Sequence, residues 1–257
     1  MGVVPATTRI GECIYCGSKT NLTKEHIVPY GLGCPGEWIL HEGSCQGCAR
    51  VTSAFERDVL KKYLMEPRAA LGLPTCRKKN RPNRLDLQLL GDGQSFTVSL
   101  PAGQCPPFII MPHFKVPAYV GNYDYQSGVM VGGSSLHGPS DMKERLARLN
   151  ANGFSVSQTL VPVSFARMLA KIAYGMAILQ FGPHAFKEVF VLPCILGQRD
   201  DVGQWVGCSE EPAIVPQVEK LLHRIEIMSN NSVVSARIRL FANYRTPVYL
   251  VFVGSLK

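Results

Sequence analysis

Apolar residues recur at helical spacing in the first quarter of the chain. Val51, Phe55 and Val59 follow one another at intervals of four residues, which brings their side chains onto one face of an α-helix. The segment 53–56 fits a capping box, a signature of a helix start, although a start one turn earlier also fits. Because proline has no amide hydrogen for helix bonding, we expect this helix to end at Pro67.

The rest of the chain shows further strand and helix patterns. Alternating apolar positions around a Gly-Asp-Gly turn predict a β-hairpin over residues 85–100. Helical periodicity predicts helices over residues 141–150 and 163–181, the second mostly buried. Alternation predicts a half-buried strand over residues 235–240, and a continuous apolar run predicts a central strand over residues 248–253. The elements together predict the α+β class.

The composition allows one large domain or two smaller ones, because 46% of the 257 residues are hydrophobic and 18% are charged. We expect a compact unit over residues 10–66. A larger α+β domain over residues 85–257 would serve recognition, regulation or dimerisation. Proline and basic residues are frequent in the segment 67–84, which predicts a linker between the two.

Four of the nine cysteines form two pairs, Cys13-x2-Cys16 and Cys45-x2-Cys48. Each pair offers two thiolates, and Zn²⁺ prefers four sulfur ligands in a closed tetrahedral site. We therefore favour a structural zinc site over a redox or disulfide pair. The other five cysteines are scattered and odd in number, which argues against a secreted disulfide framework. Short strands are expected on both sides of residues 25–26, so the predicted order is ββα.

Between the cysteine pairs lie two further motifs, Leu22-Thr23-Lys24-Glu25-His26-Ile27-Val28-Pro29 and Gly31-Leu32-Gly33. With the cysteine pairs, they resemble the zinc-containing HNH endonucleases of the ββα-metal class over residues 10–66. The resemblance implies an N-terminal ββα-metal unit whose four cysteines hold structural zinc away from the reaction. It also implies that His26 is the general base and that Glu25 binds a catalytic divalent cation, Mg²⁺ or Mn²⁺.

The implied chemistry is consistent with these residue types. Phosphodiester hydrolysis needs a water molecule activated near neutral pH, and a histidine with a pKa of about 6.5 can accept its proton. A divalent cation can neutralise the charge that develops on the phosphate and the leaving 3′-oxygen. The expected function is metal-dependent hydrolysis of double-stranded DNA. One such site cuts one strand, so a double-strand break would require a homodimer or two successive events.

Two positions depart from the family pattern. Family members usually have His or Asn directly after the last cysteine as a second metal ligand, but Ala49 stands there, and the asparagine expected before the second cysteine pair is missing. Glu56 is the first candidate to replace the missing metal ligand. Its alternative role is that of capping-box partner of Ser53. Ser53 could itself supply a weak oxygen ligand to the metal. His41 is the other candidate, with a solvated polar role as its alternative. Either another side chain completes the metal site, or the nuclease activity is weak or lost.

Basic residues continue beyond the cysteine unit and contribute to a net charge of +8 and an isoelectric point near 9.1. Such a charge suits a polyanionic partner, and cations on one segment are natural phosphate contacts. The alternative is a solvated basic face without a partner. The expected DNA contacts are Arg68, Arg77, Lys78, Lys79, Arg81 and Arg84.

Two other functions fit the same residues. One is a catalytically weak or inactive zinc module that binds nucleic acid, and the other is a metal-stapled interaction protein with an incidental basic linker. The N-terminal residues lack the apolar core of a signal peptide. The segment 163–181 carries Arg167 and Lys171 and is short for a membrane span. We therefore expect a cytoplasmic protein without a membrane partner.

Overall fold

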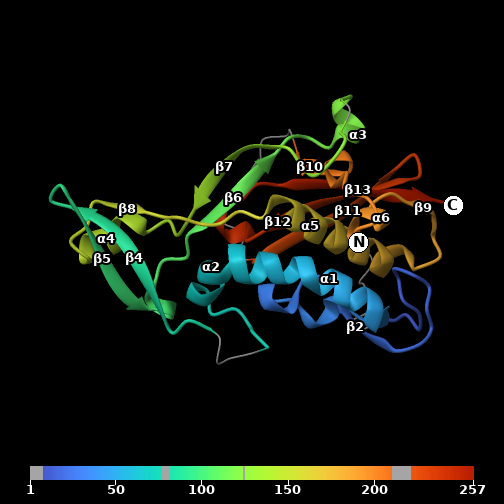
Figure 1. Ribbon diagram of the computed structural model, residues 1–257, viewed down its shortest axis with the longest axis horizontal. Helices are drawn as coiled ribbons and strands as arrows, with labels where there is room; N and C mark the ends of the chain where they lie inside the picture. The colour runs from blue at the N-terminus through green and yellow to red at the C-terminus, as the bar shows by residue number, and fades with distance from the viewer. Residues whose placement is uncertain (1–7, 77–80, 124, 210–220) are drawn as a thin grey trace.

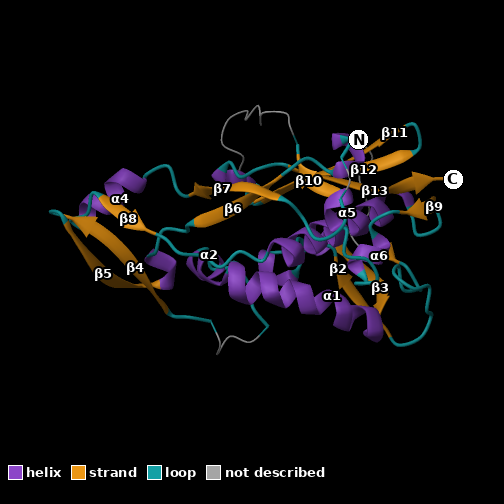
Figure 2. Cartoon of the chain, turned by 45° about the horizontal axis from the view of Figure 1, so that its top comes forward, coloured by secondary structure: helices purple, strands orange, loops and turns teal. Residues whose placement is uncertain are grey.

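Helix α5 (Pro162–Phe181) lies at the centre of the computed structural model, which describes residues 8–76, 81–123, 125–209 and 221–257. The helix packs on a five-stranded sheet and also contacts helix α1 (Gln46–Asp58), as Figures 1 and 2 show. Most of its residues from Phe165 to Ile178 are buried. A helix covered on several sides is hydrophobic around most of its circumference, which explains the apolar segment in the sequence.

The sheet is antiparallel, with the strand order β10-β13-β12-β11 and an additional pairing of β9 with β13. Ala236 lies opposite Val251, and both residues are fully buried. The predictions of a half-buried strand over residues 235–240 and a central strand over 248–253 are confirmed. The strands are β9 (Phe186–Val189), β10 (Val206–Cys208), β11 (His223–Asn230), β12 (Val233–Leu240) and β13 (Tyr249–Leu256).

The N-terminal unit folds in the order strand, strand, helix. Strand β2 (Leu22–His26) pairs antiparallel with β3 (Ile39–Cys45), and β1 (Thr8–Arg9) pairs parallel with the other edge of β3. Helix α1 follows β3 directly. The expected ββα order is confirmed, and so is the apolar helix face, since Phe55 and Val59 are buried.

The start of α1 differs from the capping-box prediction. The helix begins at Gln46, and its N-cap is Cys45, whose sulfur accepts the N–H of Cys48 at 3.4 Å. Ser53 therefore lies inside the helix, where its hydroxyl donates to the carbonyl of Arg50 at 3.0 Å. The capping box is wrong because the second cysteine pair already caps the helix. The observed start lies about two turns before Ser53, so it is also earlier than the alternative start one turn before it.

Pro67 does not end the helix as expected. A π-helical turn (Val59–Tyr63) follows α1. Leu64 then interrupts the helical geometry before α2 (Met65–Ala70) begins. Pro67 lies in the first turn of α2, where a proline costs no hydrogen bond because the first N–H groups of a helix have no partner within it. The proline is therefore accommodated in the first turn of α2 and does not end a helix.

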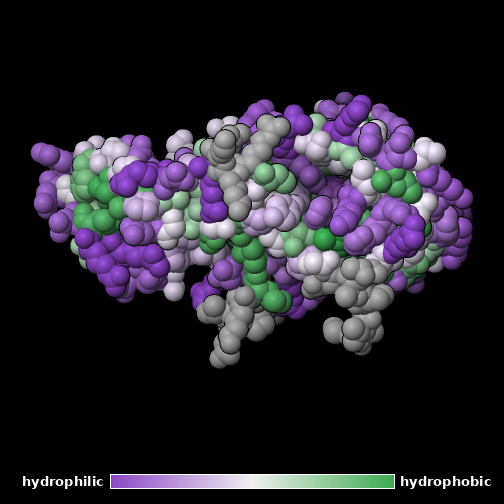
Figure 3. All heavy atoms as spheres, turned by 90° about the horizontal axis from the view of Figure 1, so that it is seen from below, coloured by the Kyte–Doolittle hydropathy of each residue, from purple (hydrophilic) through white to green (hydrophobic). Residues whose placement is uncertain are grey.

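A small lobe stands at one end of the molecule (Figure 1). Strand β4 (Arg84–Gly91) pairs with β5 (Gln94–Pro101) and with β8 (Gly153–Ser155), and α4 (Met142–Arg148) adds a helix. The predicted hairpin and the helix expected over residues 141–150 are confirmed. Hydrophobic side chains gather on the surface of this lobe (Figure 3). The lobe has a separate small core of Leu89, Leu146 and Ala151.

The remaining elements are short or connect the lobe to the sheet. Strand β6 (Ile109–Phe114) pairs antiparallel with β7 (Val131–His137) and contacts β10. Helices α3 (Ala118–Gly121) and α6 (Leu192–Ile195) are single turns. The 3-10 helices are Tyr30–Leu32, Gly36–Trp38, Ala102–Gln104, Val202–Gln204 and Ala242–Tyr244.

The main hydrophobic core extends across the expected domain boundary. Ile27 and Phe55 from the N-terminal unit belong to the same buried cluster as residues of α5 and the large sheet. Gly175 in α5 lies so close to Ile27 that an added Cβ would be 3.2 Å from it. Tyr174 also donates a hydrogen bond of 2.6 Å to the carbonyl of Ile14. The residues before and after the segment 67–84 therefore share one hydrophobic core, although that segment separates them in the sequence.

Helix α5 is long and apolar enough to cross a membrane by length and composition, and it is the one such helix among the described residues. In the fold, 67% of its apolar window is buried against other elements. It also carries Lys171, which is 2% exposed and paired with carboxylates inside the protein. The helix therefore has the environment of a core helix.

Candidate functional site

The two cysteine pairs converge where β3 joins α1. Their four sulfur atoms all lie within 4.8 Å of one another, and the sulfurs of Cys16 and Cys45 are 3.6 Å apart. Zn–S bonds of about 2.3 Å in a tetrahedron place sulfurs about 3.8 Å apart, which agrees with this spacing. The expected group is confirmed: Cys13, Cys16, Cys45 and Cys48 could hold a metal ion such as zinc.

Backbone groups shape this cluster. The N–H of Gly17 donates to the carbonyl of Cys13 at 2.8 Å, which closes the first cysteine turn, and Gly17 has a φ of 71° that favours glycine. The N–H of Cys48 donates to the sulfur of Cys45 and lowers the pKa of that thiol to about 7. A thiol with a lowered pKa loses its proton more easily, which favours metal binding at Cys45, whereas burial raises the pKa of the Cys13 and Cys48 thiols.

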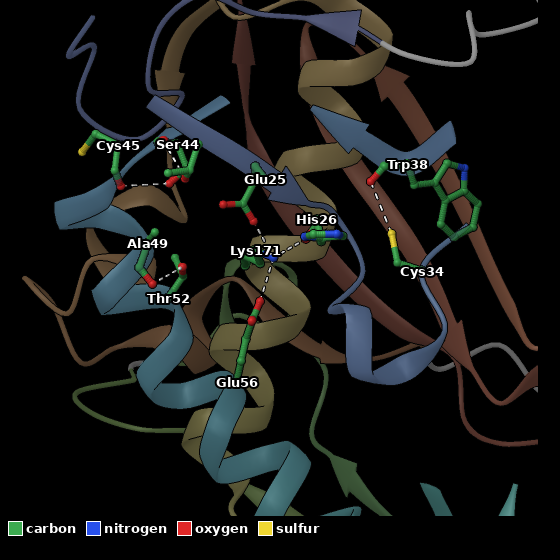
Figure 4. A network of polar contacts seen from close by, with 11 residues as sticks. Glu25, His26, Cys34, Trp38, Ser44, Cys45, Ala49, Thr52, Glu56 and Lys171 are labelled. Atoms are coloured by element: carbon green, nitrogen blue, oxygen red, sulfur yellow. Dashed lines mark hydrogen bonds and ion pairs between the residues drawn. The ribbon is translucent and has the colours of Figure 1, made fainter. Parts of the chain in front are cut away.

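Two carboxylates meet in the interior next to this cluster. Glu25 comes from β2 and is 4% exposed, and Glu56 comes from α1. The ammonium nitrogen of Lys171, from α5, lies 2.6 Å from Oε1 of Glu25 and 2.7 Å from Oε1 of Glu56. The same ammonium donates to the backbone carbonyl of His26 (Figure 4). Three elements therefore contribute to one buried ion network.

The charges of this network depend on one another. Burial alone would lower the pKa of Lys171, but Glu25 and Glu56 outweigh it and raise that pKa. Burial raises the pKa of Glu56, and the charge of Lys171 opposes this effect. Tyr15 has a buried hydroxyl without a hydrogen-bond partner among the described residues, and burial followed by the charge of Glu25 raises its pKa. Removing one charge from such a site leaves its partners uncompensated.

His26 is the last residue of β2 and lies beside the network. Its imidazole is half-buried and contacts the ring of Tyr30 edge-on, with ring centroids 5.9 Å apart. Burial lowers the pKa of His26, and the charge of Lys171 lowers it further. The imidazole is therefore neutral at neutral pH, which is the form that accepts a proton.

The structure brings only part of the expected metal-ligand set together. Among the described residues, the four cysteines are the one group of three or more His, Cys, Asp or Glu close enough to share an ion. His41 follows Leu40, which lies directly opposite Glu25 in the β2–β3 pair. Opposed residues share a face of the sheet, so His41 lies on the other face from Glu25. Ala49 offers no ligand atom.

A groove of about 820 Å³ opens beside Glu56. Its walls come from residues 30–31, α1, the π-helical turn, α2 and residues 73–76 and 81–82. Tyr30, the ring partner of His26, lines the groove as well. Among the described lining residues one is acidic, Glu56, and the cationic ones are Arg57, Lys61, Arg68 and Arg81. The groove therefore suits an anionic ligand.

The expected DNA-contacting residues lie in different surroundings. The guanidinium of Arg68 donates hydrogen bonds to three backbone carbonyls, those of Gly31 at 2.5 Å, Leu60 at 2.8 Å and Pro74 at 2.9 Å. It approaches Gly31 so closely that a Cβ there would lie 2.7 Å from the guanidinium. Arg68 therefore clamps the groove walls together, and its contact with DNA stays a prediction.

The other basic residues are divided between the groove and the lobe. Arg81 lines the groove and donates to the carbonyl of Ala69 at 3.0 Å. Arg84 lies on β4 in the lobe, where it donates to the carbonyl of Ser99 at 2.6 Å. Arg77, Lys78 and Lys79 lie outside the described residues.

Lys171 and Tyr15 are the site residues that the sequence did not reveal as such. Lys171 interrupts an apolar helix, and a buried lysine needs carboxylate partners, so the sequence contained a signal that it would be paired. The partners could not be named, because His26 and Lys171 are 145 residues apart in the chain. Tyr15, between the first two cysteines, gave no comparable signal.

No family model matches the sequence, and no curated protein or solved structure matches it significantly. The fold is mixed α+β, with a four-cysteine group able to hold a metal ion. The likeness to HNH endonucleases remains a prediction from the motifs of residues 10–66.

Proposed function

We propose that this protein is an HNH-type endonuclease that hydrolyses phosphodiester bonds of DNA, with His26 as the general base. The observation that carries this proposal is the location of His26, a neutral and half-buried imidazole at the end of β2, against Tyr30 at the edge of a cationic groove. A phosphodiester backbone is the anionic ligand that a groove of this charge fits.

The reaction assigns roles to His26, which lies against the groove-lining Tyr30, and to cationic residues that line the groove. His26 accepts a proton from water, the oxygen of that water bonds to phosphorus, and the bond to the 3′-oxygen breaks. The products are a 5′-phosphate and a 3′-hydroxyl, whose oxygen takes a proton from solvent water while protonated His26 returns its proton to solvent. Arg57 and Lys61 are exposed lining residues that would hold the phosphates in position.

We propose structural zinc for the four-cysteine group. Four sulfurs at tetrahedral spacing fit Zn²⁺, and the cluster ties the turn before β2 to the start of α1. Zinc there would fix the end of β2 relative to α1 and so the position of His26. No cysteine of the group belongs to the Glu25–Glu56 network, so zinc would act on the fold and not on the reacting phosphate.

The catalytic Mg²⁺ or Mn²⁺ expected at Glu25 and Glu56 is a different case. The ammonium of Lys171 lies within 2.7 Å of both carboxylates, between them, so a protein cation occupies the position that a bridging metal ion needs. Ala49 supplies no further ligand. The residues as arranged do not fit this metal ion, and no step of the reaction is assigned to it.

The position of the Lys171 ammonium between Glu25 and Glu56 favours a second candidate function, a zinc-stapled module that binds nucleic acid in the groove without cutting it. Both candidates use the groove and the cysteine group. They differ only in whether His26 acts on a water molecule.

Nicking of supercoiled plasmid separates them. Purified protein would be incubated with Mg²⁺, with Mn²⁺ and without added cation, beside His26→Ala and the matched control His41→Ala. The endonuclease proposal expects nicking by the wild type and by His41→Ala, and its loss in His26→Ala with DNA binding retained. If the wild type binds DNA but does not nick it under any of these conditions, the endonuclease proposal fails and the non-cleaving module is the function that fits.

A further inference from the structure

The ammonium of Lys171 is held by three oxygen atoms of the protein. A lysine ammonium carries three N–H donors. Three oxygen atoms surround this one: Oε1 of Glu25 at 2.6 Å, Oε1 of Glu56 at 2.7 Å, and the carbonyl of His26 (Figure 4). The side chain is 2% exposed, so water does not compete for these contacts. Two short ion pairs and one hydrogen bond therefore hold this internal cation in place.

A divalent cation would compete with this ammonium for the same oxygen atoms. Mg²⁺ binds carboxylate oxygen at about 2.1 Å, so an ion bridging Glu25 and Glu56 would lie almost on the position of the lysine nitrogen. Two cations in one buried site repel each other strongly. Lys171 is fixed in α5, whose neighbouring residues Ala170 and Ile172 are fully buried, so its backbone cannot withdraw without disturbing the main core.

We propose that Lys171 is the resident counter-ion of the Glu25–Glu56 pair and keeps Mg²⁺ and Mn²⁺ out of it in the free protein. A residue of α5, outside residues 10–66, thus determines which cation the carboxylates of residues 10–66 hold. By donating to the carbonyl of His26, Lys171 also positions the end of β2. The inference concerns cation binding by the free protein and does not depend on the proposed hydrolysis.

Titration of the zinc-loaded protein with Mn²⁺, without nucleic acid, tests the proposal. Free Mn²⁺ gives an electron paramagnetic resonance signal that disappears on binding, so affinity and stoichiometry are read directly. In Lys171→Met the two carboxylates lose their counter-ion, and this variant should gain one Mn²⁺ site at least about 10-fold tighter than any site of the wild type. The double variant Lys171→Met/Glu56→Gln should lose that site again.

Lys24→Met is the matched control, because it removes an exposed positive charge next to Glu25 in sequence without touching the pair. It should bind Mn²⁺ as the wild type does. Equal affinity of the wild type and Lys171→Met, or a folded Lys171→Met that gains no site, would overturn the proposal.

A second comparison does not require Lys171→Met to fold. If Lys171 excludes the ion, the wild type and Glu56→Gln bind Mn²⁺ equally weakly. A wild-type site that Glu56→Gln weakens would show that the ion reaches the carboxylate pair in the presence of Lys171, and the proposal would fail.

Discussion

At the scale of single residues, two groups of side chains define the candidate site: the four cysteines, and the ion network of Glu25, Glu56 and Lys171. The four cysteines form the expected group, and Tyr30, which contacts the ring of His26, lines the candidate groove together with Glu56. The sequence indicates Glu56 as a metal ligand or a helix cap, but in the structure it pairs with Lys171. Such pairings depend on long-range packing of α5 against α1, which no local pattern encodes.

His223 is a buried residue for which the structure predicts pH-dependent stability. It is 6% exposed, its Nε2 donates to the carbonyl of Leu32 at 2.7 Å, and its Nδ1 accepts the N–H of Phe241 at 3.3 Å. Burial lowers its pKa to about 4. The unfolded chain therefore takes up a proton below about pH 6.5 while the folded protein does not, so stability falls as pH decreases from about 6.5 to about 4.

We expect the wild type to lose about 2 kcal/mol between pH 7 and pH 5 relative to His223→Gln, whose side chain does not titrate. Urea denaturation of both proteins at pH 7, 6 and 5 measures this difference, and the subtraction removes effects of other groups such as the cysteines. Parallel pH dependence of the two proteins would show that His223 is not held neutral in the fold.

At the scale of elements, periodicity located most helices and strands, while their ends followed from tertiary contacts. Helix α1 was expected from Val51, Phe55 and Val59, yet its start is set by the Cys45 sulfur and its end comes before Pro67. The hairpin of β4 and β5 was predictable because an Asp-Gly turn with positive φ at both residues connects alternating segments. The cysteine group thus determines where α1 begins.

Loss of metal from that group should loosen β2, β3 and the start of α1. Cys45→Ser removes a metal ligand but keeps a side chain that can cap α1, so zinc content should fall and amide hydrogen exchange should accelerate over residues 10–66 because the metal is lost. Cys34→Ser is the control, because Cys34 is also half-buried but lies outside the group. Zinc analysis and exchange mass spectrometry check both. Verified zinc loss with unchanged exchange would refute a structural role.

At the scale of the whole molecule, the α+β class was predictable and the arrangement was not. The apolar segments 163–181 and 248–253 indicated buried elements, and both lie in the main core. The sequence suggested a separate unit over residues 85–257. Instead, α5 and the large sheet share their core with residues 10–66, and a smaller lobe has its own. Prolines and charged residues in the sequence predict where one unit ends and the next begins. Which elements share a hydrophobic core is instead determined by how their apolar faces fit together in the fold.

The groove predicts a salt-dependent interaction with nucleic acid. Each phosphate contact contributes a slope of about −0.9 in a plot of log affinity against log salt for duplex DNA. Replacing Arg57 and Lys61 together by Ala should therefore reduce the magnitude of the slope by about 2. Fluorescence anisotropy with a labelled duplex at several salt concentrations measures it. Lys143→Ala, an exposed lysine on α4 in the lobe, should leave the slope unchanged; equal effects of both variants would argue against the groove.

The central claim is that His26 activates water for phosphodiester hydrolysis. Its most direct measurement is cleavage of an end-labelled duplex in ¹⁸O-enriched water by the wild type and by His26→Ala, both with verified zinc content and DNA binding. We expect 5′-phosphate products that carry one ¹⁸O atom from solvent in the wild type, and no product above background in His26→Ala. Equal cleavage by His26→Ala, or product ends without solvent oxygen, would contradict it.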